Sequence, residues 1–160
     1  MHSEFAVTRN VEFFETDMAG IMHFSNYFRW MESCEAAFYR SLGLPLAAFV
    51  PGRFSAWPRV QATCQYRAPL RFNDVVEVKL FVARLGRRSI TYVFHFRKDS
   101  VLVAQGEVSV VHVKADRRAK GGMSARPIPP AVRALLQEAP DSAWHHADED
   151  SRQRTRRRRR

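Results

Sequence analysis

The sequence predicts an α+β fold in which an antiparallel sheet of about five strands wraps one long central helix. Two patterns in the 160-residue chain indicate this fold. One segment places apolar residues at helical spacing, and the segments on either side of it have the composition and alternation of strands. A chain of this length, with a hydrophobic fraction of 46%, can bury the core of a single domain.

The helix is predicted over residues 25–42. Its apolar side chains recur at the three- and four-residue spacing of one helical face: Tyr27, Trp30, Met31, Cys34, Phe38 and Leu42. Gly43 and Pro45 form a conventional helix stop. Because several of these side chains are large, we expect the sheet to cover the helix.

Strands are predicted on both sides of this helix. Residues 5–14 mix β-branched and aromatic residues with polar ones before it. Four strand segments follow it: residues 59–67, 75–84, 88–97 and 101–113. One strand, a long helix and then successive strands favour an antiparallel sheet packed on one helix. A short helix is also expected over residues 129–138, begun by two prolines.

The positive charge is concentrated at the C-terminus. The formal net charge is +10, and seven of the arginines lie in residues 152–160. This run contains no aromatic side chain that could stack on a base, so nucleic acid is not the expected partner. We expect residues 1–140 to form the folded domain and residues 141–160 to form a charged, disordered tail.

Several classes of protein are not expected from the composition. The N-terminus does not resemble a signal peptide, and no apolar run approaches the ~20 residues that span a bilayer. Cys34 and Cys64 are isolated, without the paired spacing of a disulfide framework or a zinc site. The expectation is therefore a cytoplasmic protein that binds no metal.

The most informative segment lies between the first strand and the helix. Asp17 is followed by Gly20, and then by Asn26 and Tyr27 where the helix begins. This pattern resembles the signature of the 4-hydroxybenzoyl-CoA thioesterase family, which includes the Tol–Pal-associated acyl-CoA thioesterases. The resemblance covers roughly residues 5–115. It implies the hotdog fold, in which an antiparallel sheet wraps a central helix.

Asp17 is the residue expected to carry the chemistry. Backbone N–H groups at a helix N-terminus lack intrahelical partners, so they can hold a thioester oxygen as it gains charge. A nearby carboxylate can attack the carbonyl carbon or deprotonate a water that does so. The resemblance assigns the polarising amide to Phe24, and Gly20 would let the backbone approach the ligand. The alternative is that Asp17 only forms a turn or a helix cap.

A possible helper of Asp17 is displaced in this chain. The Tol–Pal-associated branch carries a histidine seven residues after the aspartate, where this chain has Phe24, and His23 lies one place earlier. Neighbouring residues at a helix start point about 100° apart, so the role does not transfer automatically to His23. His23 is either a catalytic assistant or an ordinary loop histidine near the pocket mouth.

Two further groups of residues are candidates for substrate binding. The resemblance implies that Arg87, Arg88 and Ser89 hold the nucleotide of coenzyme A, and arginine suits bidentate phosphate contacts. The alternative is a solvated turn. Trp57, Pro58 and Tyr27 are the candidates for the acyl pocket, and ordinary packing is the alternative for each of them. Glu32 and Glu35, one turn apart on the helix, could each reach the site, but exposed carboxylates are the commoner outcome and the expected one.

The resemblance implies an enzyme that hydrolyses an acyl-CoA thioester to a free acid and coenzyme A without a cofactor. It also implies that two chains join their sheets into a homodimer with the active sites at the interface, and that dimers pair into a homotetramer. One rival is a non-catalytic module that senses acyl-CoA or binds nucleic acid. A second is a hotdog dehydratase acting on 3-hydroxyacyl thioesters, whose histidine-based site the Asp17 pattern does not match.

Overall fold

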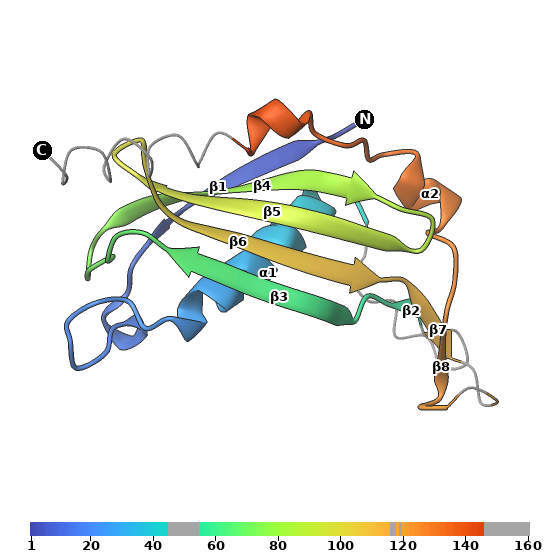
Figure 1. Ribbon diagram of the computed structural model, residues 1–160, viewed down its shortest axis with the longest axis horizontal. Coiled ribbons are helices and arrows are strands. Elements are labelled where there is room, and N and C mark those ends of the chain that lie inside the picture. Colours follow the sequence, from blue (N-terminus) through green and yellow to red (C-terminus); the bar gives the residue numbers. More distant parts are fainter. Residues whose placement is uncertain (45–54, 116–117, 119, 146–160) are drawn as a thin grey trace, which may run out of the picture.

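The computed structural model describes residues 1–44, 55–115, 118 and 120–145, and its main element is a five-stranded antiparallel sheet. The strand order is β1-β4-β5-β6-β3, so β1 and β3 form the two edges. The predicted sheet is confirmed, and Figure 1 shows how it curves around one helix. The strands are β1 Glu4–Asn10, β3 Arg59–Tyr66, β4 Val75–Leu85, β5 Ser89–Lys98 and β6 Val101–Val111.

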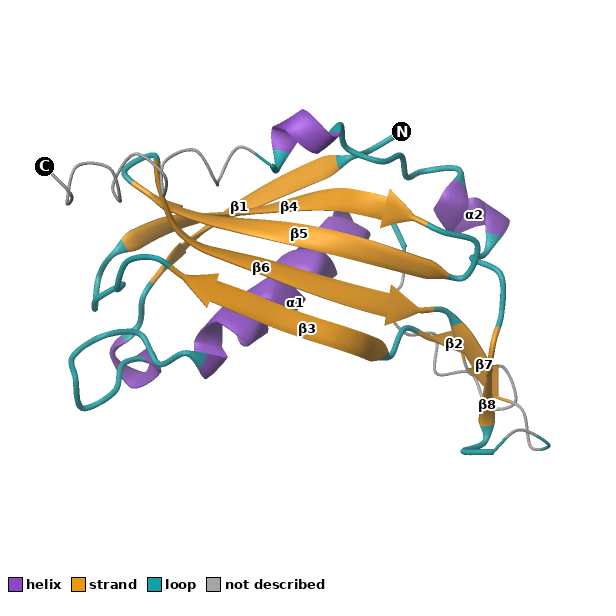
Figure 2. Ribbon diagram, in the orientation of Figure 1, coloured by secondary structure: helices purple, strands orange, loops and turns teal. Residues whose placement is uncertain are grey.

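The helix α1, Ser25–Ser41, packs on one face of this sheet, as predicted (Figure 2). Side chains alternate between the two faces of each strand, so every second residue of β4 and β5 points to the helix. These residues and the apolar face of α1 are fully buried together: Val76, Val78, Leu80 and Val82 with Ile90, Tyr92, Phe94 and Phe96, against Trp30, Met31, Cys34 and Phe38. The core therefore lies between the sheet and α1.

The first predicted strand is shorter than the pattern suggested. β1 ends at Asn10, and Phe13–Glu15 form a single 3-10 turn. The Val11 amide donates to the carbonyl of Asp74, and Glu12 and Glu15 cap the turn reciprocally. These local hydrogen bonds end the strand although the apolar residues continue beyond it.

A small second sheet was not predicted. It has the order β2-β7-β8, with β2 Ser55–Ala56, β7 Val113–Ala115 and β8 Met123–Ala125. The predicted strand 101–113 is divided at His112: its amide extends the β5–β6 pairing by one position, to the Arg88 carbonyl, and β7 then pairs with β2 and β8. The side chain of His112 then bonds Ser55 on one side and the carbonyl of Pro127 on the other.

The C-terminal part of the described chain is more extended than expected. The helix α2 covers only Pro130–Arg133, because the chain then pairs with the N-terminus through hydrogen bonds between His2 and residues 135 and 137. Residues 141–145, which fall in the expected tail, lie against the outer face of the sheet, where the Trp144 carbonyl contacts the His95 ring. Residues 146–160 lie outside the described residues. Within the described part of the chain, no helix is long and apolar enough to cross a membrane.

Candidate active site

The loop that carries Asp17 is held at its base by Glu15, which is only 4% exposed. The Glu15 carboxylate accepts hydrogen bonds from the Trp30 indole at 2.6 Å and from the Glu12 amide at 3.0 Å. The Glu15 carbonyl accepts from the His23 amide and from the Asn26 side chain, both at 2.8 Å. The expected role of Asn26 in ordering the loop is therefore visible in the structure, and Glu15 is an anchor that the sequence pattern did not reveal.

Asp17 begins a tight turn. Its side-chain Oδ1 accepts from the Ala19 amide at 2.8 Å, and its carbonyl accepts from the Gly20 amide at 2.9 Å. Gly20 has a φ of 69°, in the left-handed region that favours glycine, so the turn itself requires this residue. The carboxylate of Asp17 is exposed in the single chain.

A pocket of about 400 Å³ opens beside this turn, at the start of α1. It is lined by Asp17, Ile21, Met22, Phe24, Tyr27, Tyr66, Arg67, Ala68 and Pro69. Phe24 is the N-cap residue of α1, and its N–H makes no hydrogen bond to any of the described residues. Asp17 and Phe24, the residue whose unbonded amide lies at the positive end of α1, thus line one cavity, an arrangement suited to acyl transfer.

Aromatic side chains form a wall of this pocket. Tyr27 is 3% exposed, and its ring meets the rings of Tyr66 and Phe96 edge-on, with centroids 5.0 and 5.2 Å apart. Burial raises the pKa of Tyr27 well above its usual value, so the phenol stays protonated. The Tyr66 hydroxyl donates to the Phe24 carbonyl at 3.3 Å and ties β3 to the start of α1.

His23 is adjacent to the pocket but is not among its lining residues. Its Nδ1 lies 2.8 Å from the Ser25 hydroxyl and 3.4 Å from the Ser25 amide. Because an amide can only donate, Nδ1 is the acceptor in that contact. The ring also packs on Phe24, with centroids 4.4 Å apart. These contacts orient His23 towards the first turn of α1.

The other predicted site residues lie at the opposite end of the molecule. Trp57 packs on His112 and Tyr39, with centroids 5.0 and 6.4 Å apart, near the end of α1. Arg87, Arg88 and Ser89 lie at the turn between β4 and β5, whereas the Asp17 loop lies at the other end of the sheet (Figure 1). β4 spans eleven residues, about 35 Å, between these ends. Within one chain, Asp17 and Tyr27 line the same pocket, and neither the Trp57 region nor the β4–β5 turn reaches it.

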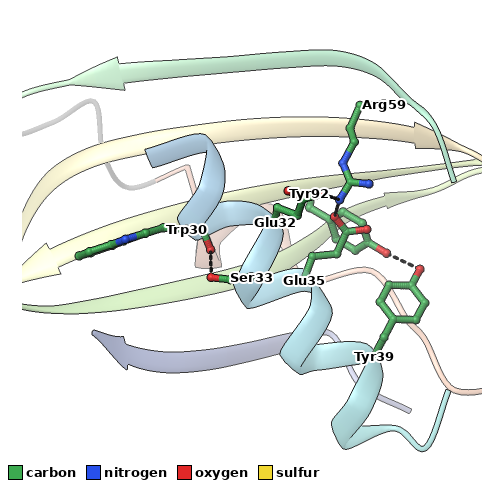
Figure 3. A network of polar contacts seen from close by, with 7 residues as sticks. All are labelled: Trp30, Glu32, Ser33, Glu35, Tyr39, Arg59 and Tyr92. Carbon is green, nitrogen blue, oxygen red and sulfur yellow. Dashed lines mark hydrogen bonds and ion pairs between the residues drawn. The ribbon is translucent and has the colours of Figure 1, made fainter. Parts of the chain in front are cut away.

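A polar cluster that was not predicted lies along α1 (Figure 3). Glu35 is 2% exposed, contrary to expectation, and its carboxylate lies 2.7 Å from the Arg59 guanidinium. Glu32 is exposed and lies 3.5 Å from the same nitrogen. Burial raises the pKa of Glu35 to about 7, and the charge of Arg59 opposes this shift. Glu35 is four residues from both Met31 and Tyr39, which places it on the buried face of α1 and could have indicated its burial from the sequence.

The curved antiparallel sheet around one helix, with a carboxylate loop at the start of that helix, defines a hotdog-fold protein. A family model described as the thioesterase-like superfamily matches residues 11–136. The chain therefore belongs to this superfamily, and the resemblance inferred from Asp17, Gly20, Asn26 and Tyr27 is confirmed at this level.

Individual relatives are consistent with this assignment. A protein from Aquifex aeolicus (strain VF5), named as a candidate esterase, is 36% identical over 110 residues, which is 69% of this chain and 85% of the relative. A 1,4-dihydroxy-2-naphthoyl-CoA hydrolase from Prochlorococcus marinus (strain MIT 9303) is 31% identical over 69% of this chain and 78% of its own length. The structure of a gentisyl-coenzyme A thioesterase superposes with a TM-score of 0.70 and 31% identity, covering 81% of this chain and 99% of that one.

A more distant structural neighbour is similar in fold. The 4-hydroxybenzoyl-CoA thioesterase from Pseudomonas sp. strain CBS-3 superposes with a TM-score of 0.73 at 19% identity, covering 84% of this chain and 99% of that one. At 19% identity this likeness shows a shared fold and no more.

Proposed function

We propose that this protein hydrolyses an acyl-CoA thioester to a carboxylic acid and free coenzyme A, with Asp17 as the reacting carboxylate. The observation that carries the proposal is the single pocket bordered by Asp17 and by Phe24 at the N-terminus of α1. Membership of the thioesterase-like superfamily supports the reaction class. The proposed reaction uses water and the side chains of the protein, without a metal or a redox cofactor.

In the proposed reaction the thioester carbonyl lies between the Asp17 carboxylate and the Phe24 amide. Asp17 either attacks the carbonyl carbon, giving a mixed anhydride that water hydrolyses, or takes a proton from a water that attacks. In both routes the Phe24 N–H donates to the carbonyl oxygen as its negative charge grows. In the first route the carbon–sulfur bond breaks as the anhydride forms, so coenzyme A leaves as its thiolate before water releases the acid from Asp17. In the second route the bond breaks when the tetrahedral intermediate formed by water collapses, and the proton that Asp17 took passes to the departing thiolate.

The acyl group is proposed to be aromatic. Two of the named relatives act, by their names, on dihydroxynaphthoyl and gentisyl thioesters, and both of these acyl groups contain an aromatic ring. Phe24, Tyr27 and Tyr66 offer ring surfaces in a pocket of about 400 Å³, and aromatic rings pack favourably edge-to-face. Release of thiol from benzoyl-type and straight-chain acyl-CoAs, compared on one enzyme preparation, tests the preference.

A homodimer formed through β3 is also proposed. β3 is an edge strand with mostly exposed side chains, including Val60 and Tyr66, and uncovered edges promote pairing. Two-fold antiparallel pairing of β3 with its copy would set the Arg59 end of one chain beside the Tyr66 end of the other.

This pairing would complete the site. The register aligns Arg59 with Val110, Ile90 and Leu85, so the Arg59 end of β3 and the β4–β5 turn lie at one end of the sheet. Trp57 and Pro58 of one chain would then approach the Asp17 pocket of the other, and so would the end of the sheet that carries Arg87 and Arg88. A tetramer built from two such dimers remains part of the proposal.

Subunit mixing tests the shared site. Asp17→Asn and the double variant Arg87→Ala/Arg88→Ala are each expected to release thiol poorly. After unfolding and refolding together, mixed dimers would hold one site with an intact Asp17 and intact partner arginines, so activity should partly return. Absence of any recovery, with dimers present by light scattering, would count against an interface site.

The central test is turnover by Asp17→Asn. An asparagine keeps the side-chain oxygen that accepts from the Ala19 amide, so the turn persists while the carboxylate is lost. We expect kcat to fall by about a thousandfold. Asp99→Asn, the same change at an exposed turn between β5 and β6, is the matched control and should retain wild-type turnover. Wild-type turnover by Asp17→Asn on the best substrate would falsify the proposed chemistry.

A further inference from the structure

A second pocket, of about 380 Å³, lies between α1 and β1, the edge of the sheet opposite β3. We call it the β1–α1 groove. From α1 it is lined by Ser33, Ala37 and Arg40, which share one helical face, and from β1 by Arg9. Because Ser33 and Ala37 are small, the space between the two arginines is open. None of its lining residues lines the Asp17 pocket, and a dimer formed through β3 would leave the groove uncovered.

The guanidinium of Arg9 is held in this groove by contacts on two sides. Its Nη1 donates to the Ser33 hydroxyl at 2.8 Å, and its central carbon lies 5.1 Å from the centroid of the Trp30 ring. The Ser33 hydroxyl donates in turn to the Trp30 carbonyl at 3.1 Å (Figure 3). Among the described residues Arg9 has no carboxylate partner and no second hydrogen-bond acceptor. Most of its N–H donors therefore stay available to a ligand.

The lining of the groove carries more positive than negative charge. Arg40 is exposed, about 10 Å along the helix from Ser33, and forms no ion pair with the residues that the structure describes. Glu12, also exposed, is the one acidic residue in the lining. Thr8 and Asn10 add uncharged hydrogen-bond donors. The groove therefore offers two arginines and further donors to a small anion.

We propose that the β1–α1 groove binds a small phosphorylated anion between Arg9 and Arg40. A phosphate monoester carries a charge of about −1.5 to −2 at neutral pH, which two arginines can balance despite the nearby Glu12. The planar fork of arginine also matches phosphate oxygens in a bidentate contact. The Trp30 ring is only 1% exposed, so it offers no face on which a nucleobase could stack. Recognition would therefore rest on the phosphate group itself.

A ligand in the groove would act on the Asp17 loop through Trp30. The indole of Trp30, on which Arg9 lies, donates to the Glu15 carboxylate at 2.6 Å, and Glu15 anchors that loop. A ligand that holds Arg9 on the ring would restrain this contact, so the loop would open less often. Binding requires no reaction at Asp17, so it can be tested separately from the proposed hydrolysis.

The test is isothermal titration of the full chain with inorganic pyrophosphate. The parent protein is Arg87→Ala/Arg88→Ala, so that the proposed coenzyme A contacts do not contribute to the signal. This parent should bind pyrophosphate, and adding Arg9→Gln or Arg40→Gln should weaken binding by about tenfold each. Arg84→Gln, at an exposed arginine of β4 outside the groove, is the matched control and should bind as the parent does.

Three further measurements on the same parent separate the parts of the proposal. Glu12→Gln removes the negative charge from the lining and should strengthen binding by about twofold to threefold. Asp17→Asn should bind as the parent does, because the Asp17 pocket is separate from the groove. Pyrophosphate should slow amide hydrogen exchange over residues 16–24 in the parent but not in Arg40→Gln, since only the parent would be occupied.

The site is overturned if the parent does not bind, or if the parent and Arg40→Gln bind equally. Because Arg40 is exposed, this comparison stays decisive even where Arg9→Gln unfolds more easily. Equal affinity for succinate would contradict the preference for phosphate, and unchanged exchange over residues 16–24 in the bound parent would contradict the link to the Asp17 loop. A smaller assembly mass for Arg40→Gln without ligand would make the groove a contact between copies of this chain.

Discussion

The Glu15 carboxylate accepts a hydrogen bond of 2.6 Å from the indole of Trp30, a residue of α1 fifteen positions further along the chain. Because Glu15 also accepts from the Glu12 amide, Glu15→Ala leaves two donors without their partner. We expect the free energy of unfolding to fall by about 1–3 kcal/mol. Faster amide hydrogen exchange over residues 16–24 should accompany a lower kcat, since the loop that carries Asp17 would lose its anchor.

The matched control for Glu15→Ala is Glu4→Ala, which removes an exposed carboxylate paired with Lys79 at 3.1 Å. Surface ion pairs contribute about 0–1 kcal/mol, so little change in stability is expected. Unaltered exchange of residues 16–24 in Glu15→Ala would show that other contacts hold the loop, such as the hydrogen bond between the Met22 amide and the Leu70 carbonyl.

Glu35 should make stability decrease as the pH rises. Burial raises its pKa from 4.5 to about 7, so between these values the folded chain keeps a proton that the unfolded chain has lost. The Glu35 contribution is therefore complete below about pH 4.5 and is lost as the pH rises through about 7. Over this window Glu35 accounts for a loss of about 3 kcal/mol. Urea unfolding of wild type and Glu35→Gln at pH 5 and pH 8 measures the difference.

Glutamine at position 35 retains an oxygen that can accept from Arg59 but carries no charge, so the variant should lack this part of the pH dependence. Glu32→Gln is the control because Glu32 approaches the same guanidinium from an exposed position. It should follow the wild-type curve closely. Parallel curves for wild type and Glu35→Gln would mean that the Arg59 ion pair keeps Glu35 charged throughout.

The pH dependence of stability expected from His95 is opposite in sign to that expected from Glu35. Burial, with the positive charge of Arg97, lowers its pKa to about 4, so between about pH 6.5 and 4 the unfolded chain takes up a proton that the folded chain refuses. Its contribution is present above pH 6.5 and is lost as the pH falls through about 4. His95→Gln keeps a donor for the Trp144 carbonyl and should be less sensitive to acid. NMR titration of the His95 ring measures its pKa directly, and a midpoint near 6.5 would contradict the predicted lowering.

The periodicity of apolar residues predicted the long helix and the main strands, because burial of one face determines that pattern. The apolar residues of α1 between Tyr27 and Phe38 face the sheet at helical spacing. The side chains of β4 and β5 alternate between the two faces of the sheet, as their pattern indicated. The elements that were missed depend on individual hydrogen bonds. β6 gives way to β7 at His112, whose side chain bonds Ser55 and the Pro127 carbonyl, and α2 ends where the chain pairs with His2. No repeating pattern encodes such contacts.

The candidate site was predictable in part for the same reason. Asp17 and Phe24 are close in sequence, so a motif could identify both, and the structure places both at one pocket. The contacts of Glu15 and Glu35 could not be identified because their partners, Trp30 and Arg59, are fifteen and twenty-four residues away, although helical spacing could have indicated that Glu35 is buried. Trp57 and Arg87 are candidates that one chain cannot test, since the proposed dimer is what would bring them to the pocket.

Gly106 and Met31 should be strongly coupled, because the Met31 side chain packs directly on this glycine of β6. A Cβ built on Gly106 would overlap the Met31 sulfur, and Met31 is 1% exposed, so it has little space to move. Gly106→Ala should lower the free energy of unfolding by about 1–3 kcal/mol through overpacking. Met31→Ala should lower it by about 2–5 kcal/mol through the cavity it creates. In the double variant the new methyl group enters that cavity, so the combined loss should be at least about 1 kcal/mol smaller than additivity predicts.

Gly106→Ala combined with Val76→Ala in β4, with β5 between the two strands, is the control pair and should be additive. Urea unfolding of the wild type, the single variants and the double variants gives the free energies needed for both double-mutant cycles. Additivity in the Met31 pair would show that the backbone of β6, rather than the Met31 side chain, moves to accommodate the alanine.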